Sequence, residues 1–321
     1  MIEALTLGAI ALVATIAVGY PATNFLRERK VGKAISEDGP ESHQVKAGTP
    51  TMGGLFLVLV VVAVTAAGNL VDRWSIGLPL LVVGSLALLG FVDDLGSLQG
   101  RPQRALQRRV KFAAFLVIGT GAAIGLYHYL ELSTVQVPYD GPHDIGWVYI
   151  PIAIAIIVLT AGGVAVNDGL DGLVAGASAI AYGAYGFIAL YQEQTYLGAF
   201  CFTVAGALLG FLWHNSYPAR VFMGDTGALA LGGGLAVVAF MTGQWLVLPL
   251  IGIVFVMDGA SVGMQVFYYR LTGGKRIFKM APVHHHFEQV GWSEVQVTQR
   301  FWVIQFLGAA LGTILALEVY S

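Results

Sequence analysis

The sequence predicts an all-α polytopic membrane protein with about ten transmembrane helices. Three observations carry this prediction. Of the 321 residues, 56% are hydrophobic and only 11% are charged, whereas soluble domains carry about 25% charged residues. Apolar runs of about 16 to 22 residues, the length at which a helix crosses a bilayer, recur along the chain. The 42 glycines are expected where transmembrane helices pack closely.

Ten apolar runs are expected to form the spans, and an even number places both termini on the same face of the membrane. No soluble domain or disulfide framework is expected beside them, because the only cysteine, Cys201, lies in an apolar run. We therefore assign residues 1–321 to a single integral membrane domain. The approximate limits of the spans are 2–22, 52–68, 76–92, 109–130, 148–166, 173–191, 197–213, 228–243, 246–269 and 301–319.

The basic residues orient this arrangement in the membrane. Sixteen of the 17 Lys and Arg residues fall in segments on one face, and only Arg73 falls on the other. Cytoplasmic loops are enriched in Lys and Arg, so we expect those segments in the cytoplasm and both termini outside it. The basic segments are 23–51, 93–111, 214–227 and 270–300.

One extracytoplasmic loop, 131–147, is longer than the others. Thr134 to Val137 alternate polar and apolar side chains, and Asp140-Gly141 is a turn signal. A small extracytoplasmic β-hairpin is expected there.

The start of the second span and the end of the third carry the first candidate site residues. Lys46, Thr49 and Thr51 stand beside a helix N-terminus, which suits an anion, although a plain helix start explains them equally well. Asp93 and Asp94 close the third span. Two adjacent carboxylates repel each other unless a cation or a proton relieves them; the alternative is a solvated helix end.

Two further acids, Asp168 and Asp171, lie in the short connection between the fifth and sixth spans. Their spacing places them one helical turn apart, so they can share a face. That connection contains no Lys or Arg, so a metal ion or a cation from another loop is the expected partner. The alternative is a tight glycine-rich turn with a capping aspartate.

The stretch 213–234, WHNSYPARVFMGDTGALALGGG, is a short polar excursion between two apolar runs. Asp225 stands between Gly224 and Gly227, where the next helix would begin. A carboxylate at this point is suited to hold a hard cation against a phosphate. The alternative is that Asp225 or Thr226 only caps the helix.

The ninth span and the loop after it hold the last candidates. Asp258 lies inside the span, where an ionisable group is usually functional or paired, and Gly259 and Ser261 could break the helix there. His284, His285 and His286 are consecutive, so their side chains point in different directions. A three-histidine metal site is therefore awkward, and phosphate binding or carboxylate orientation suits them better.

These clusters share the predicted cytoplasmic face with many basic residues. The chemistry they indicate is metal-assisted handling of phosphates, with Mg²⁺ or Mn²⁺ as the hard, oxygen-ligated ion. A P-loop, a dinucleotide-binding glycine motif, a Ser-His-Asp signature and a CDP-alcohol phosphotransferase pattern are all absent from the sequence.

Five motifs together resemble the phospho-N-acetylmuramoyl-pentapeptide transferase family, within the polyprenyl-phosphate N-acetylhexosamine-1-phosphate transferase superfamily. The superfamily shares the acidic motifs, and the APVHHHFE segment points to this family over its GlcNAc-1-phosphate relatives. The motifs are KAGTPTMGG (46–54), FVDDL (91–95), NDGLDGL (167–173), NSYPARVFMGDTGALALGG (215–233) and RIFKMAPVHHHFEQVGW (276–292).

The resemblance implies that UDP-MurNAc-pentapeptide and undecaprenyl phosphate react to give lipid I and UMP with Mg²⁺. By position in the motifs it implies that Asp93, Asp94, Asp225, His284, His285 and His286 are catalytic, with Asp225 also the Mg²⁺ ligand. It implies substrate binding by Lys46, Thr51, Lys111, Asp168, Asp171, Asn215 and Phe222, the last as a uracil-stacking ring. It further implies a homodimer in the bacterial inner membrane, in contact with membrane lipid and with no nucleic-acid partner.

One motif departs from the family pattern, and two questions stay open. The family usually has two residues between Asn and Asp in the NxxDGLDGL motif, whereas Asn167 abuts Asp168 and Ala165 takes the usual Asn position. Asp93 or Asp94 could accept the proton of the lipid phosphate, or could attack the substrate and form a phosphoryl-enzyme. A GlcNAc-1-phosphate transferase and an ion-coupled transporter are the alternative functions.

Overall fold

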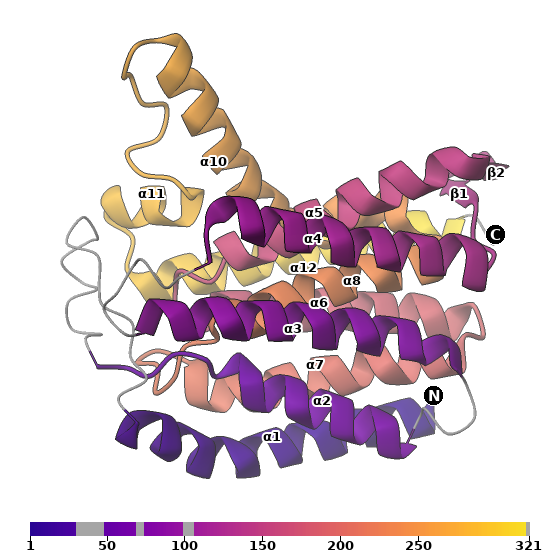
Figure 1. Ribbon diagram of the computed structural model, residues 1–321, viewed down its shortest axis with the longest axis horizontal. Helices are drawn as coiled ribbons and strands as arrows, with labels where there is room; N and C mark the ends of the chain where they lie inside the picture. Colours follow the sequence, from indigo (N-terminus) through magenta and orange to yellow (C-terminus); the bar gives the residue numbers. More distant parts are fainter. Residues whose placement is uncertain (30–47, 69–73, 99–105, 319–321) are drawn as a thin grey trace.

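The structure is a computed structural model that describes residues 1–29, 48–68, 74–98 and 106–318 (Figure 1). Its main helices are α1 (Ile2–Glu28), α2 (Gly54–Gly68), α3 (Gly77–Leu98), α4 (Arg108–Ile124), α5 (Tyr149–Val166), α6 (Leu173–Tyr191), α7 (Thr195–Asn215), α8 (Gly224–Met241), α9 (Leu248–Ile251), α10 (Ile253–Leu271), α11 (Val283–Gln289) and α12 (Glu294–Glu318). Short helical turns are η2 (Trp74–Ile76), the π-helical η3 (Gly125–Tyr129), η4 (Gly146–Val148) and η5 (Trp245–Val247). The strands are β1 (Thr134–Val137) and β2 (Gly141–Asp144).

Each of the ten predicted apolar runs is helical in the described part of the chain. Among the residues that the structure describes, eight helices are long and apolar enough to cross a membrane, or nine if the bent pair formed by 245–251 and α10 counts as one span. The remaining run forms α2, which is apolar but has only 15 residues. The predicted class, an all-α polytopic membrane protein, is confirmed.

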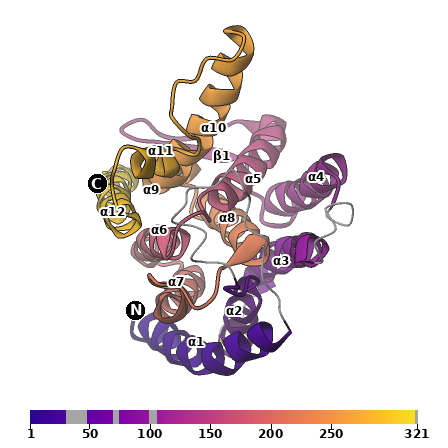
Figure 2. The same cartoon turned by 90° about the vertical axis from the view of Figure 1, so that its left-hand side faces the viewer.

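Helix α8 lies at the centre, and the other long helices surround it (Figure 2). Nearly every residue of α8 is buried inside the protein. Other helices of similar apolar composition, such as α4 and α5, are mostly not buried within the protein. Small residues permit this burial, because helices without bulky side chains can approach one another closely. At Gly90 of α3 a side chain would overlap the backbone of Asp225 and Thr226, so this glycine sets the distance between α3 and the start of α8.

The ninth span is not the continuous helix that the hydropathy of 246–269 predicts. It breaks at Gly252, and α10 leaves the preceding segment at an angle of 83° and projects from the bundle (Figure 1). The break frees backbone groups, and Gln305 of α12 satisfies two of them: it donates to the carbonyl of Ile251 and accepts from the amide of Val254. The helix continues through Gly259 and Ser261, the two residues at which the sequence would have allowed a break.

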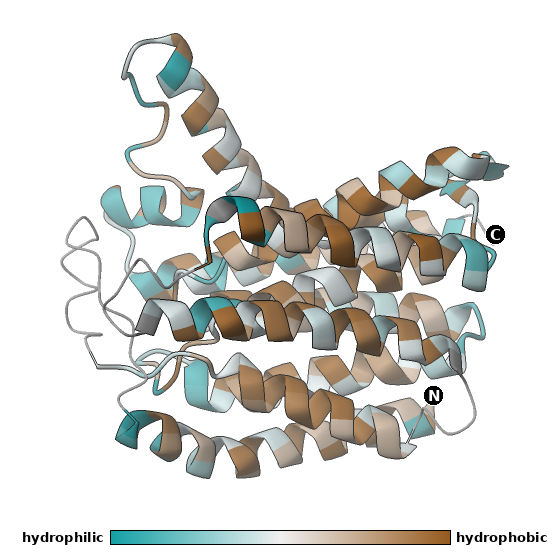
Figure 3. Ribbon diagram, in the orientation of Figure 1, coloured by the Kyte–Doolittle hydropathy of each residue, from teal (hydrophilic) through white to brown (hydrophobic). Residues whose placement is uncertain are grey.

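Hydrophilic residues gather at both ends of the bundle, and apolar residues predominate in its middle (Figure 3). One end carries the predicted hairpin, in which β1 and β2 pair antiparallel from Thr134↔Asp144 to Val137↔Gly141, so this prediction is confirmed. Helix α1 begins and α12 ends at this end (Figure 1). The opposite end holds the starts of α4, α8 and α12, the end of α3 and the helix α11.

Candidate functional site

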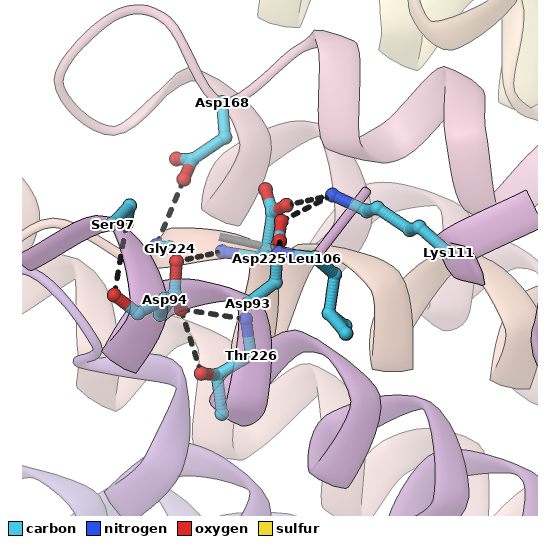
Figure 4. A network of polar contacts seen from close by, with 9 residues as sticks. All are labelled: Asp93, Asp94, Ser97, Leu106, Lys111, Asp168, Gly224, Asp225 and Thr226. Carbon is cyan, nitrogen blue, oxygen red and sulfur yellow. Dashed lines mark hydrogen bonds and ion pairs between the residues drawn. The ribbon is translucent and has the colours of Figure 1, made fainter. Parts of the chain in front are cut away.

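An aspartate cluster forms where the end of α3 meets the start of α8 (Figure 4). Asp93 and Asp94 do not end α3 but lie in its last turns, which extend to Leu98. Helical neighbours point in directions about 100° apart, so the two carboxylates have different surroundings. Asp94 is 2% exposed, while the side chain of Asp93 is 17% exposed.

Asp94 caps α8 from a neighbouring helix. Its carboxylate accepts from the amides of Asp225 (3.2 Å) and Thr226 (3.0 Å) and from the Thr226 hydroxyl (2.7 Å). A carboxylate at a helix N-terminus satisfies amides that have no partner within the helix and favours its dipole. Helix α8 has no side-chain cap of its own. Asp225 is thus not the cap, and its carboxylate is available for another role.

Lys111 of α4 joins Asp93 to Asp225. Its ammonium Nζ donates to Asp93 Oδ2 at 2.6 Å and to Asp225 Oδ2. The three side chains are only 17–25% exposed, so the cation offsets the repulsion of two carboxylates that solvent screens incompletely. The amide of Leu106 also donates to Asp93 Oδ1 (3.1 Å). The structure therefore places Lys111, for which the resemblance implies a substrate-binding role, in this cluster.

Asp168 reaches the same place from the connection between α5 and α6. Its Oδ2 accepts from the amide of Gly224 at 2.9 Å (Figure 4). Gly224 has φ +74°, in the left-handed region that favours glycine, and a β-carbon there would come within 2.6 Å of Asp94 Oδ2. Thr51 is buried beside the same glycine. Thr51, Asp94, Asp168 and Asp225 therefore surround one backbone position.

Asp171 and Asn215 are buried and hold the loop 216–223 in place. Asp171 accepts from the amide of Ala219 (2.9 Å), and Asn215 donates to the carbonyl of Val221 (2.9 Å) while accepting from the amide of Gly172 (3.1 Å). The Asp171 carboxylate and the Asn215 side-chain amide thus both hydrogen-bond to the backbone that precedes Phe222. That residue is half-buried, and its backbone bonds to Pro50 and Gly53, each at 2.8 Å.

The three consecutive histidines have three different partners. His284 is fully buried and its Nδ1 lies 2.7 Å from Asp258 Oδ2. His285 places Nδ1 2.7 Å from Glu288 Oε2, and its side chain is 12% exposed. His286 accepts from the amide of Lys279 (3.1 Å), which closes the preceding loop.

The histidine segment, residues 284–286, contacts Gly169 of the aspartate loop, which is the connection 167–172 between α5 and α6 that carries Asp168 and Asp171. A β-carbon at Gly169 would lie 2.5 Å from His284 Nε2 and 3.2 Å from His285 Nε2. Asp168 and the first two histidines are therefore neighbours across this glycine. Of the predicted site residues, Lys46 lies outside the described part of the chain.

Sequence reasoning missed three participants. Asn167 is buried and donates to Asp258, Glu288 holds His285, and Glu294 Oε1 accepts from the amide of Asp171 at 2.7 Å. Asp258 had been weighed between a functional role and a structural pair, and it makes contacts with both Asn167 and His284. In the sequence, the contacts among Asn167, Asp258 and His284 were indicated only by the position of an ionisable residue, Asp258, deep in an apolar span.

The aspartate cluster offers carboxylate oxygens, the ligands that a hard cation prefers. Within the described residues, no group of three or more His, Cys, Asp or Glu side chains is arranged to hold a metal ion. Mg²⁺, however, is commonly bound through one or two carboxylates together with substrate phosphates. Asp225, 24% exposed and next to Asp93, fits that mode.

Comparisons with known proteins agree on one family. Residues 76–243, just over half of the chain, match glycosyl transferase family 4, and residues 46–58 match signature 1 of the phospho-N-acetylmuramoyl-pentapeptide-transferases. The chain is similar to proteins of that name from Chloroflexus aurantiacus (48% identity, 99% of this chain and 90% of the relative), Geobacillus kaustophilus (43%, 95% and 95%) and Listeria innocua (40%, 94% and 95%).

Proposed function

Because the chain belongs to the phospho-N-acetylmuramoyl-pentapeptide-transferase family, we propose that it transfers phospho-MurNAc-pentapeptide from UDP-MurNAc-pentapeptide to undecaprenyl phosphate. The products are lipid I and UMP, and the reaction belongs to peptidoglycan synthesis. The observation that carries this proposal is the set of Asp93, Asp168 and Asp225 with Lys111 around the start of α8. Carboxylates and a cation gathered at a helix N-terminus suit phosphoryl transfer, in which positioning and charge stabilisation dominate.

Asp93 is the better proton acceptor of the adjacent pair. Asp94 is buried and three donors already occupy its oxygens, whereas Asp93 is partly exposed and has two donors, the Lys111 ammonium and the Leu106 amide. In the proposed step, Asp93 takes the proton from the lipid phosphate. The freed oxygen attacks the sugar-linked phosphorus, and the bond to the UMP oxygen breaks. Radiolabelled phosphate trapped on the protein during turnover would instead favour attack by an aspartate.

Asp225 would hold Mg²⁺ together with the pyrophosphate of the substrate. When bound, the ion would neutralise charge on the pyrophosphate and on the departing UMP. Lys111 keeps the Asp225 carboxylate in place beside Asp93. Asp171 and Asn215 would act through the loop 216–223, which presents Phe222 for stacking on the uracil. His285, oriented by Glu288 at Nδ1, would donate from Nε2 to a phosphate oxygen as an imidazolium, the form in which both ring nitrogens carry a proton.

An apolar groove gives the polyprenyl chain a place beside the site. A cavity of about 590 Å³ lies between α5, α9 and α10, and it is lined by residues such as Val158, Gly162, Phe255 and Val256. It extends along α5 as far as Val166, next to the aspartate loop. An isoprenoid tail in this groove would bring its phosphate towards Asp168 and Asp93.

The membrane orientation follows from the same arrangement. UDP-sugars are cytoplasmic substrates, so we place the aspartate end of the bundle in the cytoplasm and the hairpin end, with both termini, outside. The protein is then a multi-pass protein of the bacterial inner membrane. The predicted homodimer is testable by the mass of the detergent-solubilised protein; a purely monomeric mass would contradict it.

The proposal is tested with purified protein, a polyprenyl phosphate and radiolabelled UDP-MurNAc-pentapeptide or UDP-GlcNAc. We expect UMP release and a lipid-linked product from the first substrate only, with Mg²⁺ present, and loss of both on adding EDTA until Mg²⁺ is restored. Turnover of UDP-GlcNAc alone would favour the GlcNAc-1-phosphate transferase. Folded protein that turns over neither substrate would contradict the proposed function.

A further inference from the structure

We propose that Asp258 is a positioning residue for the transfer reaction, which together with Asn167 fixes His284 against the aspartate loop. The inference rests on the proposed function and extends it to residues in the interior of the bundle. Asp258 lies on α10, Asn167 follows α5 and His284 belongs to α11. The three residues therefore tie the projecting helix and the histidine segment to the site.

Asp258 is fully buried and has three donors. Its Oδ2 accepts from the side-chain amide of Asn167 and lies 2.7 Å from His284 Nδ1, and its Oδ1 accepts from the backbone amide of His284 at 3.3 Å. A buried carboxylate without partners is costly, so these donors account for its presence in an apolar span. Asn167 and His284 are buried as well, which leaves little room for either to find another partner.

Helix α10 also supplies the N-terminal caps of α11. Helix α11 has no side-chain cap of its own, and its first two amides are those of Val283 and His284. Val283 donates to the Ser261 hydroxyl at 2.9 Å and His284 donates to Asp258. Asp258 and Ser261 are three residues apart on one face of α10. The start of α11 is therefore fixed to α10 at two points.

The carboxylate sets the tautomer of His284. An ionised carboxylate can only accept a hydrogen bond, so Nδ1 carries the proton and Nε2 is directed to the other side of the ring. Nε2 is buried and has no hydrogen-bond partner among the described residues. It points at Gly169, where a β-carbon would come within 2.5 Å. His284 thus packs directly on the aspartate loop.

This contact continues to the reacting end of the site. The residue before Gly169 is Asp168, whose carboxylate accepts from the amide of Gly224 at the start of α8 (Figure 4). On the other side, the rings of His284 and His285 lie edge to face with centroids 4.2 Å apart. A shift of His284 would therefore move both Asp168 and His285.

The test compares Asp258→Asn and Asn167→Ala with the wild type. Asparagine keeps the size of Asp258 but presents an amide NH₂ to one of its donors; Asn167→Ala keeps the carboxylate and removes one donor. Asp258→Glu restores a carboxylate. The matched control is Asp140→Asn, which removes the partner of His143 (2.7 Å) in the β-hairpin at the other end of the molecule.

Two readouts separate positioning from simple stabilisation. The first is kcat and KM for UDP-MurNAc-pentapeptide, expressed per folded molecule. The second is the ¹⁵N NMR spectrum of histidine-labelled protein, in which His284→Gln assigns the His284 resonances among the seven histidines. The second readout requires no activity.

We expect the wild type to show His284 protonated on Nδ1. In Asp258→Asn the NH₂ faces either His284 Nδ1 or the His284 backbone amide, so we expect the ring ¹⁵N signals of His284 to shift. For Asp258→Asn we expect kcat to fall by about 10- to 100-fold with KM changed less than about threefold, because small misplacements of reacting groups have effects of this size. Asn167→Ala should lose less, Asp258→Glu should recover part of the loss, and Asp140→Asn should match the wild type. Ring ¹⁵N signals of His284 that are unchanged in Asp258→Asn, or a kcat per folded Asp258→Asn molecule within twofold of the wild type, would overturn the proposal. If the wild type itself releases no UMP, the proposed function fails, and the NMR comparison still decides whether Asp258 fixes His284.

Discussion

Gly90→Ala is the substitution that tests most sharply how α3 and α8 build the site. A β-carbon at Gly90 would overlap the carbonyl of Asp225 and would lie 2.5 Å from the amide nitrogen of Thr226. These are backbone atoms in the first turn of α8, so no side-chain rotation can relieve the overlap. The two helices have to separate.

The size of the separation follows from these contacts. Nonbonded heavy atoms rest about 3.5 Å apart, so the start of α8 has to move by roughly 1 Å relative to α3. Overpacking of this kind costs about 1–3 kcal/mol of stability. A misplacement of about 1 Å in a catalytic group can lower the rate about 100-fold. Because the movement separates Asp225 from Asp93 and Asp94, activity should suffer more than folding.

The assay is UMP release per folded molecule together with thermal unfolding in detergent. Gly84→Ala is the matched control, since Gly84 lies on the same helix and a β-carbon there meets nothing within 4 Å. We expect Gly84→Ala to keep the wild-type rate and Gly90→Ala to lose about 30- to 100-fold. A folded Gly90→Ala protein with at least a third of the wild-type rate would refute this reasoning.

Three further predictions concern neighbouring contacts. Asp94→Asn turns an amide towards the N-terminal N–H groups of α8 and should lower the free energy of unfolding by about 1–3 kcal/mol. Thr226→Val, which removes one hydroxyl, should lower it by about 1 kcal/mol. Equal midpoints of denaturation for wild type and Asp94→Asn would contradict the capping role. Gly169→Ala should displace His284 and lower kcat at least about tenfold. Gly183→Ala, with open space around its β-carbon, should leave kcat unchanged. Equal rates for the two variants would exclude the contact at Gly169. Gly162→Leu projects a side chain into the apolar groove. Because filling the groove removes apolar contact area for the lipid, KM for the polyprenyl phosphate should rise about fivefold or more. An unchanged KM would place the lipid elsewhere.

Hydropathy and spacing predicted the helices and the shared face of the acids because both depend on local composition. Each apolar run had to become a helix in order to satisfy its backbone in the membrane. The acids at the ends of these runs then had to meet at one end of the bundle. The same reasoning placed the β-hairpin in the loop 131–147. The assignment of residues 1–321 to one domain stays a prediction.

The division of roles between adjacent residues could not be predicted from the sequence. Asp93 and Asp94 are equivalent in a motif, yet one pairs with Lys111 and the other caps α8. Asp225 was open to either capping or cation binding, and Asp94 takes the capping role. Partners such as Asp94 and Thr226 are 132 positions apart, so only the packed structure brings them together.

The break in the ninth span had the same long-range cause. Gly252 permits it, but Gln305 of α12 supplies the hydrogen bonds that replace those of the helix. A hydropathy profile records that a segment is apolar and does not record such a partner. Asn167, where the motif departs from the family pattern, likewise has a partner distant in sequence, because its side chain donates to Asp258.

The central claim is that Asp225 acts in phosphoryl transfer and does not merely begin α8. The most direct measurement is Mg²⁺-dependent UMP release by Asp225→Asn, with the folded fraction determined in the same sample and Asp144→Asn in the β-hairpin as control. Because Asp94 caps the helix, we predict that Asp225→Asn stays folded and loses at least about 100-fold in rate, as expected for the loss of a group that stabilises the transition state, while Asp144→Asn keeps the wild-type rate. A folded Asp225→Asn protein that releases UMP at the wild-type rate would contradict the claim.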